Sequence, residues 1–456
     1  MCWPISPAAW GAADPDGSDS GSRLVPVRQA AYQPAMKPKL LSLLPGYTRR
    51  MFAADAIAGV TVAMVAIPLS IAIGIASGAD PAKGLVTAIV AGFLISLLGG
   101  SRVQIGGPTG AFIVVVFGVI ADHGYDGLVL ATLMAGVILL LAGLFRVGDL
   151  IAFVPEAVVN GFTIGIAVII ASGQFKDFLG LDAQQVPAEF LGKMEALWAA
   201  RATIDWTATA AGLVTVVLLV VLRRLFPRVP GPIFVLGGVS LAAYALGLRV
   251  DTIFSRYGDL PASLPLPTLP VISAGRLVEL LPSALVIAFL AAIESLLSAM
   301  VADRMMENAR HRPNAEVLAQ GWANIGSALF GGMPATGAIA RTATNVRAGG
   351  QTPVAGMIHA IAILAVMMVA APLAGFLAMP VLAALLMVTA WNMSEPHKWA
   401  GYWAAPVEER LLLILTLVLT VFADLTVAIG VGVGLGLALR LRGGRSVADD
   451  WQTPEH

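Results

Sequence analysis

Charged residues are scarce in this chain of 456 residues, where 28 Lys and Arg and 28 Asp and Glu together make up only 12%. Soluble domains carry about 25% charge, so the sequence has too few charges to cover a globular surface. Hydrophobic residues make up 58%, the mean hydropathy is +0.84, and the long apolar runs have the length that crosses a bilayer. The composition predicts an integral membrane protein in contact with lipid.

Four further absences narrow the range of possible functions. A single cysteine, Cys2, excludes an internal disulfide and a cysteine metal site, and the five histidines show no spacing that would build a metal site. We therefore expect no cofactor. The basic residues form no stripe, which argues against a nucleic-acid partner. No nucleophile–base pair is visible, so a membrane enzyme is the least favoured class.

Apolar runs divide most of the chain into about fourteen segments. They lie near residues 55–77, 84–100, 108–121, 126–145, 153–173, 206–226, 232–248, 280–302, 315–330, 336–346, 353–371, 376–393, 408–423 and 425–441. Several are shorter than the roughly 20 residues of a straight crossing, so some should be half-helices. The predicted fold class is an all-α polytopic membrane protein.

The two ends of the chain differ from its middle. Residues 1–36 are rich in Pro, Gly, Ala, Ser and Asp and contain no apolar core of a signal peptide. We expect residues 1–49 to form a disordered cytoplasmic extension, within which Met36 would also serve as a start site. Residues 50–441 form the predicted membrane domain, and residues 442–456 form a short cytoplasmic tail.

Basic residues indicate how the segments cross the bilayer. With the N-terminus in the cytoplasm, most Lys and Arg residues fall on the cytoplasmic side, as the positive-inside rule requires. The exceptions outside the segments lie mostly in two long loops that the rule discounts: Lys83, Lys176, Lys193, Arg201, Arg249, Arg256 and Arg276. We expect a multi-pass protein of the inner or plasma membrane with both termini in the cytoplasm.

Two similar motifs interrupt the apolar segments. Residues 106–111 read GGPTGA, residues 331–338 read GGMPATGA, and each motif opens an unusually short segment. These short segments are the third and the tenth, an odd offset of seven, so the two halves would insert with opposite orientation. This pattern predicts two inverted repeats of seven segments, with the paired interruptions marking the binding site.

A helix that begins inside the membrane leaves its first N–H groups without partners. Two such helix N-termini aimed at one point near the midplane would combine their dipoles into a cage for an anion. Thr109 and Thr336 could cap these helices or donate hydroxyls to the ligand. The alternative is a pair of packing kinks, because Gly and Pro are common in membrane helices.

Two charged residues lie at membrane depth. Arg341, one turn into the second short helix, is expected to face a wet cavity and add a positive charge to the cage, unless it snorkels to the cytoplasmic interface. Burial favours the protonated form of the Glu294 carboxyl, which suits proton coupling, and Ser298 at i+4 could complete an oxygen cluster for Na⁺. The alternative for Glu294 is a neutral hydrogen bond to a neighbouring helix.

Five stretches of the chain resemble the sulfate permease (SulP) family of anion transporters. They are residues 65–70 (VAIPLS), 105–112, 292–299 (AIESLLSA), 319–324 (AQGWAN) and 330–356 (FGGMPATGAIARTATNVRAGGQTPVAG), of which the last is long and highly specific. The resemblance covers about residues 50–441.

The resemblance implies a mobile core of segments 1–4 and 8–11 and a gate of segments 5–7 and 12–14, often at a homodimer contact. It places the anion between the third and tenth helix starts, against the first segment. Arg341 matches the basic residue beside the anion, and Glu294 matches the carboxylate used for coupling. The substrate-binding positions carried over are Thr109, Gly110, Ala111, Gly337, Ala338 and Ile339.

The chain departs from the family pattern at two places. Many relatives have Gln after the first-segment proline, where this chain has Leu69, and this removes one polar contact. Relatives usually carry a C-terminal STAS domain, for which the short tail leaves no room. We expect the regulation or assembly that this domain supplies to be absent or provided in trans.

The sequence thus predicts a secondary active transporter of a small anion that works by elevator-type alternating access and is coupled to H⁺ or Na⁺ through Glu294. Sulfate, bicarbonate and C4-dicarboxylates all fit a cage of helix N-termini. A nucleobase carrier of the same fold is an alternative, although Arg341 counts against it because a base needs polar or acidic partners. An anion channel or a voltage-sensitive motor is another, which transport rates and capacitance would distinguish.

Overall fold

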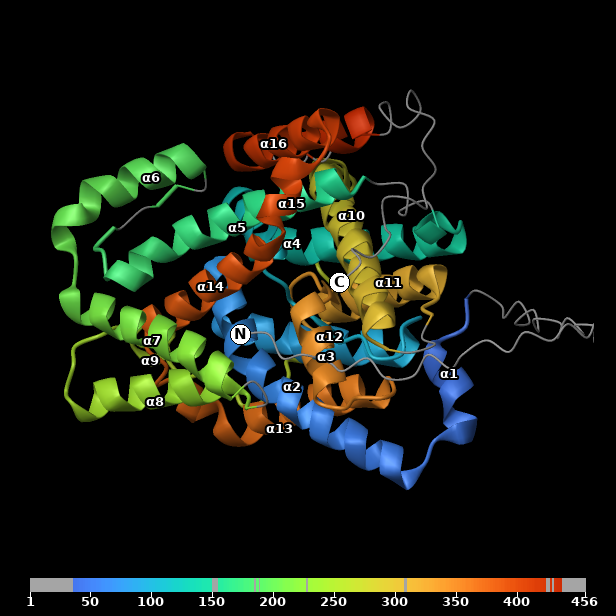
Figure 1. Ribbon diagram of the computed structural model, residues 1–456, viewed down its shortest axis with the longest axis horizontal. Helices are drawn as coiled ribbons and strands as arrows, with labels where there is room; N and C mark the ends of the chain where they lie inside the picture. The colour runs from blue at the N-terminus through green and yellow to red at the C-terminus, as the bar shows by residue number, and fades with distance from the viewer. Residues whose placement is uncertain are drawn as a thin grey trace, which may run out of the picture. The chain divides into compact units, whose positions relative to one another are not determined.

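A computed structural model describes residues 36–149, 155–183, 186–187, 189–226, 229–306, 310–423, 427–428 and 430–436. Helices dominate these ranges, and two very short strands interrupt them (Figure 1). The elements are α1 (Lys39–Leu43), α2 (Arg49–Ala76), α3 (Pro81–Leu98), β1 (Gly106–Gly107), α4 (Phe112–Leu144), α5 (Glu156–Leu179), α6 (Phe190–Ala199), α7 (Trp206–Leu225), α8 (Gly231–Ala245), α9 (Ile253–Tyr257), α10 (Ala274–Met305), α11 (Pro313–Leu329), β2 (Thr336–Gly337), α12 (Ile339–Arg347), α13 (Val354–Ala374), α14 (Met379–Met393), α15 (Trp399–Ala404) and α16 (Val407–Phe422).

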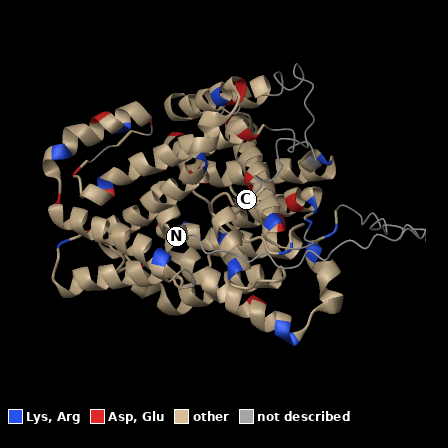
Figure 2. Cartoon of the chain, viewed as in Figure 1, with Lys and Arg blue, Asp and Glu red and all other residues tan. Residues whose placement is uncertain are grey.

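Seven of the described helices are long and apolar enough to cross a membrane, namely α2, α3, α4, α5, α7, α10 and α13, and α8 is a shorter apolar helix. Figure 2 shows long stretches of helix without a charged residue. Such stretches satisfy their backbone polar groups internally, which is what a lipid environment demands.

Each of the first thirteen predicted segments is helical in the structure. The third and fourth run together as α4, with a break at Gly124, whose φ of 69° and ψ of 178° lie outside the helical region. Glycine adopts this conformation without the strain of a Cβ atom. The fourteenth segment lies partly outside the described residues, although residues 427–428 and 430–436 are helical.

The predicted disordered extension is wrong for residues 39–49, because α1 and the start of α2 lie there. The Lys39 backbone N–H donates to the Gly99 carbonyl at 2.8 Å, and its ammonium donates to the Arg310 carbonyl at 2.8 Å. The Thr48 hydroxyl caps α2 by accepting from the Met51 N–H. These long-range contacts fix a segment whose composition resembles a loop; residues 1–35 of the predicted extension lie outside the described residues.

The helices pack in two groups. In the first, α4 packs against α10 and α11, α2 against α3 and α13, and α3 against α11 and α13. In the second, α5 packs against α14 and α16, and α7 against α8 and α14 (Figure 1). The first group holds predicted segments 1–4 and 8–11, and the second holds segments 5–7, 12 and 13. Contacts between the groups are fewer and involve mainly α2 and α4 with α5, α8 and α14.

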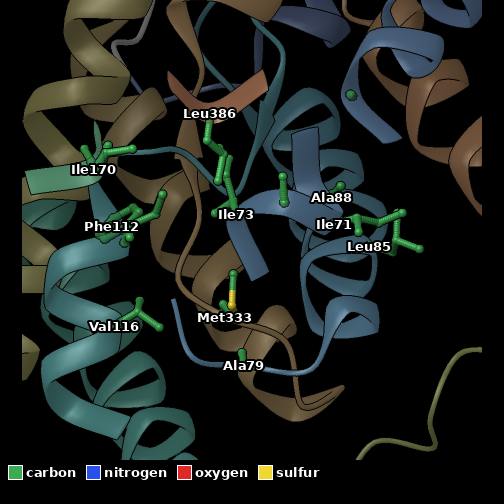
Figure 3. Close-up of a cluster of buried hydrophobic side chains, with 14 of the residues drawn as sticks. Ile71, Ile73, Ala79, Leu85, Ala88, Phe112, Val116, Ile170, Met333 and Leu386 are labelled. Atoms are coloured by element: carbon green, nitrogen blue, oxygen red, sulfur yellow. The ribbon is translucent and has the colours of Figure 1, made fainter. Parts of the chain in front are cut away.

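Apolar side chains fill the junction between the groups. Figure 3 shows Ile73 of α2 and Phe112 of α4 gathered with Ile170 of α5 and Leu386 of α14, and all four are buried. Van der Waals packing between such side chains stabilises the contact without fixing one direction of approach. The two groups therefore meet through a surface with little directional bonding.

A buried carboxylate ties two helix starts together at one end of the first group. Asp55 of α2 accepts hydrogen bonds from the backbone N–H groups of Gln351 (2.6 Å) and Thr352 (3.0 Å) and from the Tyr47 hydroxyl (3.0 Å). Burial and the Asp55 carboxylate raise the pKa of Tyr47 to about 12, so its O–H remains a donor. Asp55 thus joins the start of α2 to the turn before α13.

Candidate functional site

The two interruptions between helices lie side by side; we call residues 106–111 the first break and residues 331–338 the second break. Strands β1 and β2 pair antiparallel, with Gly106 opposite Gly337 and Gly107 opposite Thr336. The Ala338 N–H extends this ladder by donating to the Ile105 carbonyl at 2.8 Å. Because four residues separate β1 from the start of α4 at Phe112, and one residue separates β2 from the start of α12 at Ile339, the ladder brings the two helix starts close together.

Each helix start presents backbone donors. Among the described residues, the N–H groups of Gly110 and Ala111 before α4, and of Ile339 and Ala340 at the start of α12, have no hydrogen-bond acceptor. The first N–H groups of a helix lack intrahelical partners and carry the positive end of its dipole. The site therefore combines donors from two helices.

The six predicted substrate-binding positions differ in what they can offer. Thr109 is half-buried, Gly110 and Ala111 are buried, and Ile339 is 42% exposed. The Ala338 N–H is taken up by the β ladder, so it is not free to bind a ligand in this conformation. Gly337 provides space: a Cβ atom on it would collide with the Gln104 side chain.

Replacing Gly337 by alanine is expected to destabilise the protein by about 1–3 kcal/mol, since overpacking at a closed site forces its neighbours apart. Gly238→Ala in α8 is the matched control, because a Cβ there meets no atom within 4 Å. Thermal unfolding in detergent measures both. Equal unfolding temperatures would mean that β1 and β2 are less tightly held than described.

Glu294 of α10 faces the first break. The Thr109 hydroxyl donates to Glu294 Oε2 at 2.7 Å, and Glu294 as a whole residue is half-buried. Ser298, one turn further along α10, is fully buried and bonds the Thr342 hydroxyl at 3.0 Å. The two residues therefore contact different parts of the site, Glu294 the first break and Ser298 the helix that follows the second break. Within the described ranges, no group of three or more His, Cys, Asp and Glu side chains is arranged to hold a metal ion.

Arg341 of α12 is buried at the centre of the site. It is 1% exposed, and its Nη2 donates to the Ser70 hydroxyl and to the Pro108 carbonyl, both at 3.1 Å. The expectation of a wet cavity at this side chain is wrong for this conformation, because α2 covers the guanidinium through Ser70. Gly107, with φ of 149°, leaves room for Nη1, which a Cβ atom would strike.

The charge of Arg341 is not balanced locally. Its Nε and Nη1 have no hydrogen-bond partner, and it forms no ion pair within the described residues. An uncompensated cation in a medium of low dielectric is unfavourable unless an anion joins it. Arg341 therefore adds a full positive charge beside two helix N-termini.

Sequence reasoning missed the polar residues that hold the breaks in place. Ser295 lies at the centre of this network: it accepts from Gln104 at 2.8 Å and Gln320 at 2.6 Å, and donates to Glu316 at 2.8 Å. Asn324 accepts the Ala335 N–H just before β2 at 2.9 Å. The available signal was the spacing i, i+4, i+8 of Glu316, Gln320 and Asn324, which places one polar stripe along α11.

Comparison with known proteins identifies the family. The model of the sulfate permease family matches residues 52–416. The "Putative sulfate transporter YvdB" of Bacillus subtilis is 44% identical over 381 residues, covering 83% of this chain and 72% of that protein. The bicarbonate transporter BicA of Synechocystis is 32% identical over 384 residues, covering 81% of this chain and 66% of BicA.

Solved structures agree with this assignment. The transmembrane domain of a cyanobacterium bicarbonate transporter BicA superposes with a TM-score of 0.76 at 32% identity, over 84% of this chain and 99% of that one. The murine anion transporter Slc26a9 shares the fold at a TM-score of 0.81 and 16% identity, over 93% of this chain and 74% of that one. The predicted all-α polytopic fold with two repeats is confirmed. Since the family match spans most of a chain whose broken helices lie as the sequence motifs predict, the chain belongs to the sulfate permease family.

Proposed function

We propose that this protein transports a small inorganic anion across the membrane and binds it between the starts of α4 and α12, beside Arg341. The observation that carries the proposal is the buried guanidinium of Arg341, which among the described residues has no ion-pair partner and lies next to two sets of unpaired helix N–H groups. Donors fixed in this way suit an oxyanion or a halide. The names of the relatives YvdB and BicA put sulfate and bicarbonate first among the candidates, with C4-dicarboxylates behind them.

Glu294 is the proposed coupling residue. Its carboxyl accepts a hydrogen bond from Thr109 at the first break, and therefore lies near the place proposed for the anion. A proton bound at this carboxyl would reduce the repulsion between Glu294 and an incoming anion. Proton coupling is favoured over Na⁺ coupling, because Ser298 bonds Thr342 and adds no oxygen ligand beside Glu294.

Alternating access is proposed to occur by movement of the first helix group against the second. The site residues all belong to the first group, and the groups meet through apolar side chains that can slide without breaking hydrogen bonds. We propose a homodimer in the inner or plasma membrane, with both termini in the cytoplasm, as the positions of the basic residues indicate.

Uptake into proteoliposomes tests the function. The purified chain is reconstituted and given radiolabelled sulfate, bicarbonate, succinate or uracil under imposed pH or Na⁺ gradients. We expect saturable uptake of sulfate or bicarbonate that an inward proton gradient drives above equilibrium. Uptake of uracil alone would establish a nucleobase carrier. Fluxes far above carrier rates, or a nonlinear capacitance without uptake, would establish a channel or a motor instead.

A further inference from the structure

A cavity of about 660 Å³ lies between the two helix groups, away from Arg341 and Glu294. Its walls come from α2, α4, α5, α6, α9, α10 and α16, and the lining includes Phe117, Gly173 and Thr420. This volume falls within the roughly 300–1,000 Å³ typical of small-molecule sites, so the cavity has room for a hydrated inorganic anion.

Lys193 of α6 is the buried charge of this cavity. Its side chain lines the cavity, is only 8% exposed, and places Nζ 5.7 Å from the centroid of the Phe117 ring. Among the described residues its ammonium has no hydrogen-bond acceptor and no carboxylate partner. Burial lowers the pKa of Lys193, and an anion beside it would favour the charged form.

The other charged side chains of the cavity are satisfied or exposed. Arg256 pairs with Asp177 at 2.7 Å, and Lys176 donates to the Ala183 carbonyl at 2.6 Å. The two remaining acids of the lining, Asp122 and Glu189, are exposed, so water solvates their charges. Lys193 is therefore the cavity's buried cation without a partner among the described residues.

The inner end of the cavity approaches the start of α4. Ile113 and Ile170 both line it. A Cβ atom placed on Gly110 would lie 3.2 Å from the Ile170 side chain, so this isoleucine stands between the cavity and a backbone donor of the proposed central site. An anion held at Lys193 would thus occupy the same cavity that Ile170 borders on the side of the helix starts.

We propose that this cavity is a second binding site for small inorganic anions, in which the Lys193 ammonium is the charged ligand and from which the anion passes to the helix starts. Lys193 is buried and its Nζ lies 5.7 Å from the centroid of the Phe117 ring, and shielding from bulk water strengthens the attraction between an ammonium and an anion. A single cation in a wide cavity binds an anion weakly and releases it readily. Both properties suit a transient site from which the anion moves on to the helix starts.

Chemical labelling tests the binding directly and does not rest on the proposed function. Acetic anhydride acetylates free amines, and peptide mass spectrometry reads the extent at each lysine of the protein in nanodiscs. We expect sodium sulfate to slow acetylation of Lys193 about tenfold relative to sodium gluconate of equal ionic strength. Lys83 is the matched internal control, because its Nζ likewise lies over an aromatic ring, 5.0 Å from the centroid of Tyr125, outside the cavity lining.

Transport by the Lys193→Met variant tests whether the anion passes through this cavity to the helix starts. This second test rests on the proposed function. We expect the KM for sulfate or bicarbonate supplied from the cavity side to rise about tenfold with kcat unchanged, while Lys83→Met matches the unmodified protein. Lys193→Arg keeps the charge and should restore the low KM, which separates loss of the ligand from misfolding.

Equal labelling of Lys193 in sulfate and gluconate would overturn the second site. Protection of Lys193 by sulfate, together with an unchanged KM in Lys193→Met, would show that the anion does not pass through this cavity during transport. If the unmodified chain transports no anion, the proposed function fails, while the labelling result still decides whether the site exists.

Discussion

Arg341→Ala is expected to raise the KM for anion uptake by about 100-fold or more, because truncating one partner of a buried charge pair costs about 2–5 kcal/mol. The substitution removes the full positive charge beside the helix starts and leaves only their partial charges. Thermal stability should fall little, since the lost guanidinium has two unpaired donors and no ion-pair partner among the described residues. Proteoliposome uptake over a range of anion concentrations measures the effect.

Arg347→Ala is the matched control for Arg341→Ala. Arg347 ends the same helix, α12, but is exposed, so its removal should leave KM unchanged. Arg341→Lys retains the charge and loses the planar fork that reaches Ser70 and Pro108, and it should recover part of the affinity. Unchanged KM in Arg341→Ala would show that the anion binds elsewhere.

Glu294→Gln is expected to abolish concentrative uptake while anion exchange continues. Glutamine keeps a hydrogen-bond acceptor for the Thr109 hydroxyl but binds no proton, so the driving gradient no longer acts on the cycle. Accumulated anion should therefore fall to the equilibrium level at every imposed pH gradient. Uptake with an inward proton gradient, compared with exchange at equal pH, separates the two modes.

Glu279→Gln provides the control for Glu294→Gln, because Glu279 lies on the same helix, has a side chain 58% exposed and pairs with His123. It should leave the gradient dependence intact. Concentrative uptake with the original ion dependence in Glu294→Gln would assign coupling to another residue.

Local patterns in the sequence account for the helices and the two breaks, but not for the contacts that order the site. Apolar runs marked the spans, and the repeated GGPTGA and GGMPATGA motifs marked β1 and β2. Gln104 and Ser295 are 191 positions apart, and no pattern along the chain predicts their hydrogen bond. Only the packing of α10 and α11 against the breaks brings these side chains together.

Arg341 illustrates the same limit. Its position one turn into a short helix was predictable, whereas its burial depends on Ser70 of α2, which lies 271 positions away. The short helix α1 was missed for a related reason, because its order comes from distant acceptors such as the Gly99 carbonyl rather than from its own propensity. Tertiary partners decide such cases.

The ladder between β1 and β2 has a mechanical consequence. Main-chain hydrogen bonds surrounded by protein are expensive to break without water to replace them. The ladder therefore holds the starts of α4 and α12 together as one rigid unit. Under the proposed function, we expect the starts of α4 and α12 to bind and release the anion without separating from each other. The two would move together relative to the second helix group, and a crosslink between the two groups should stop transport.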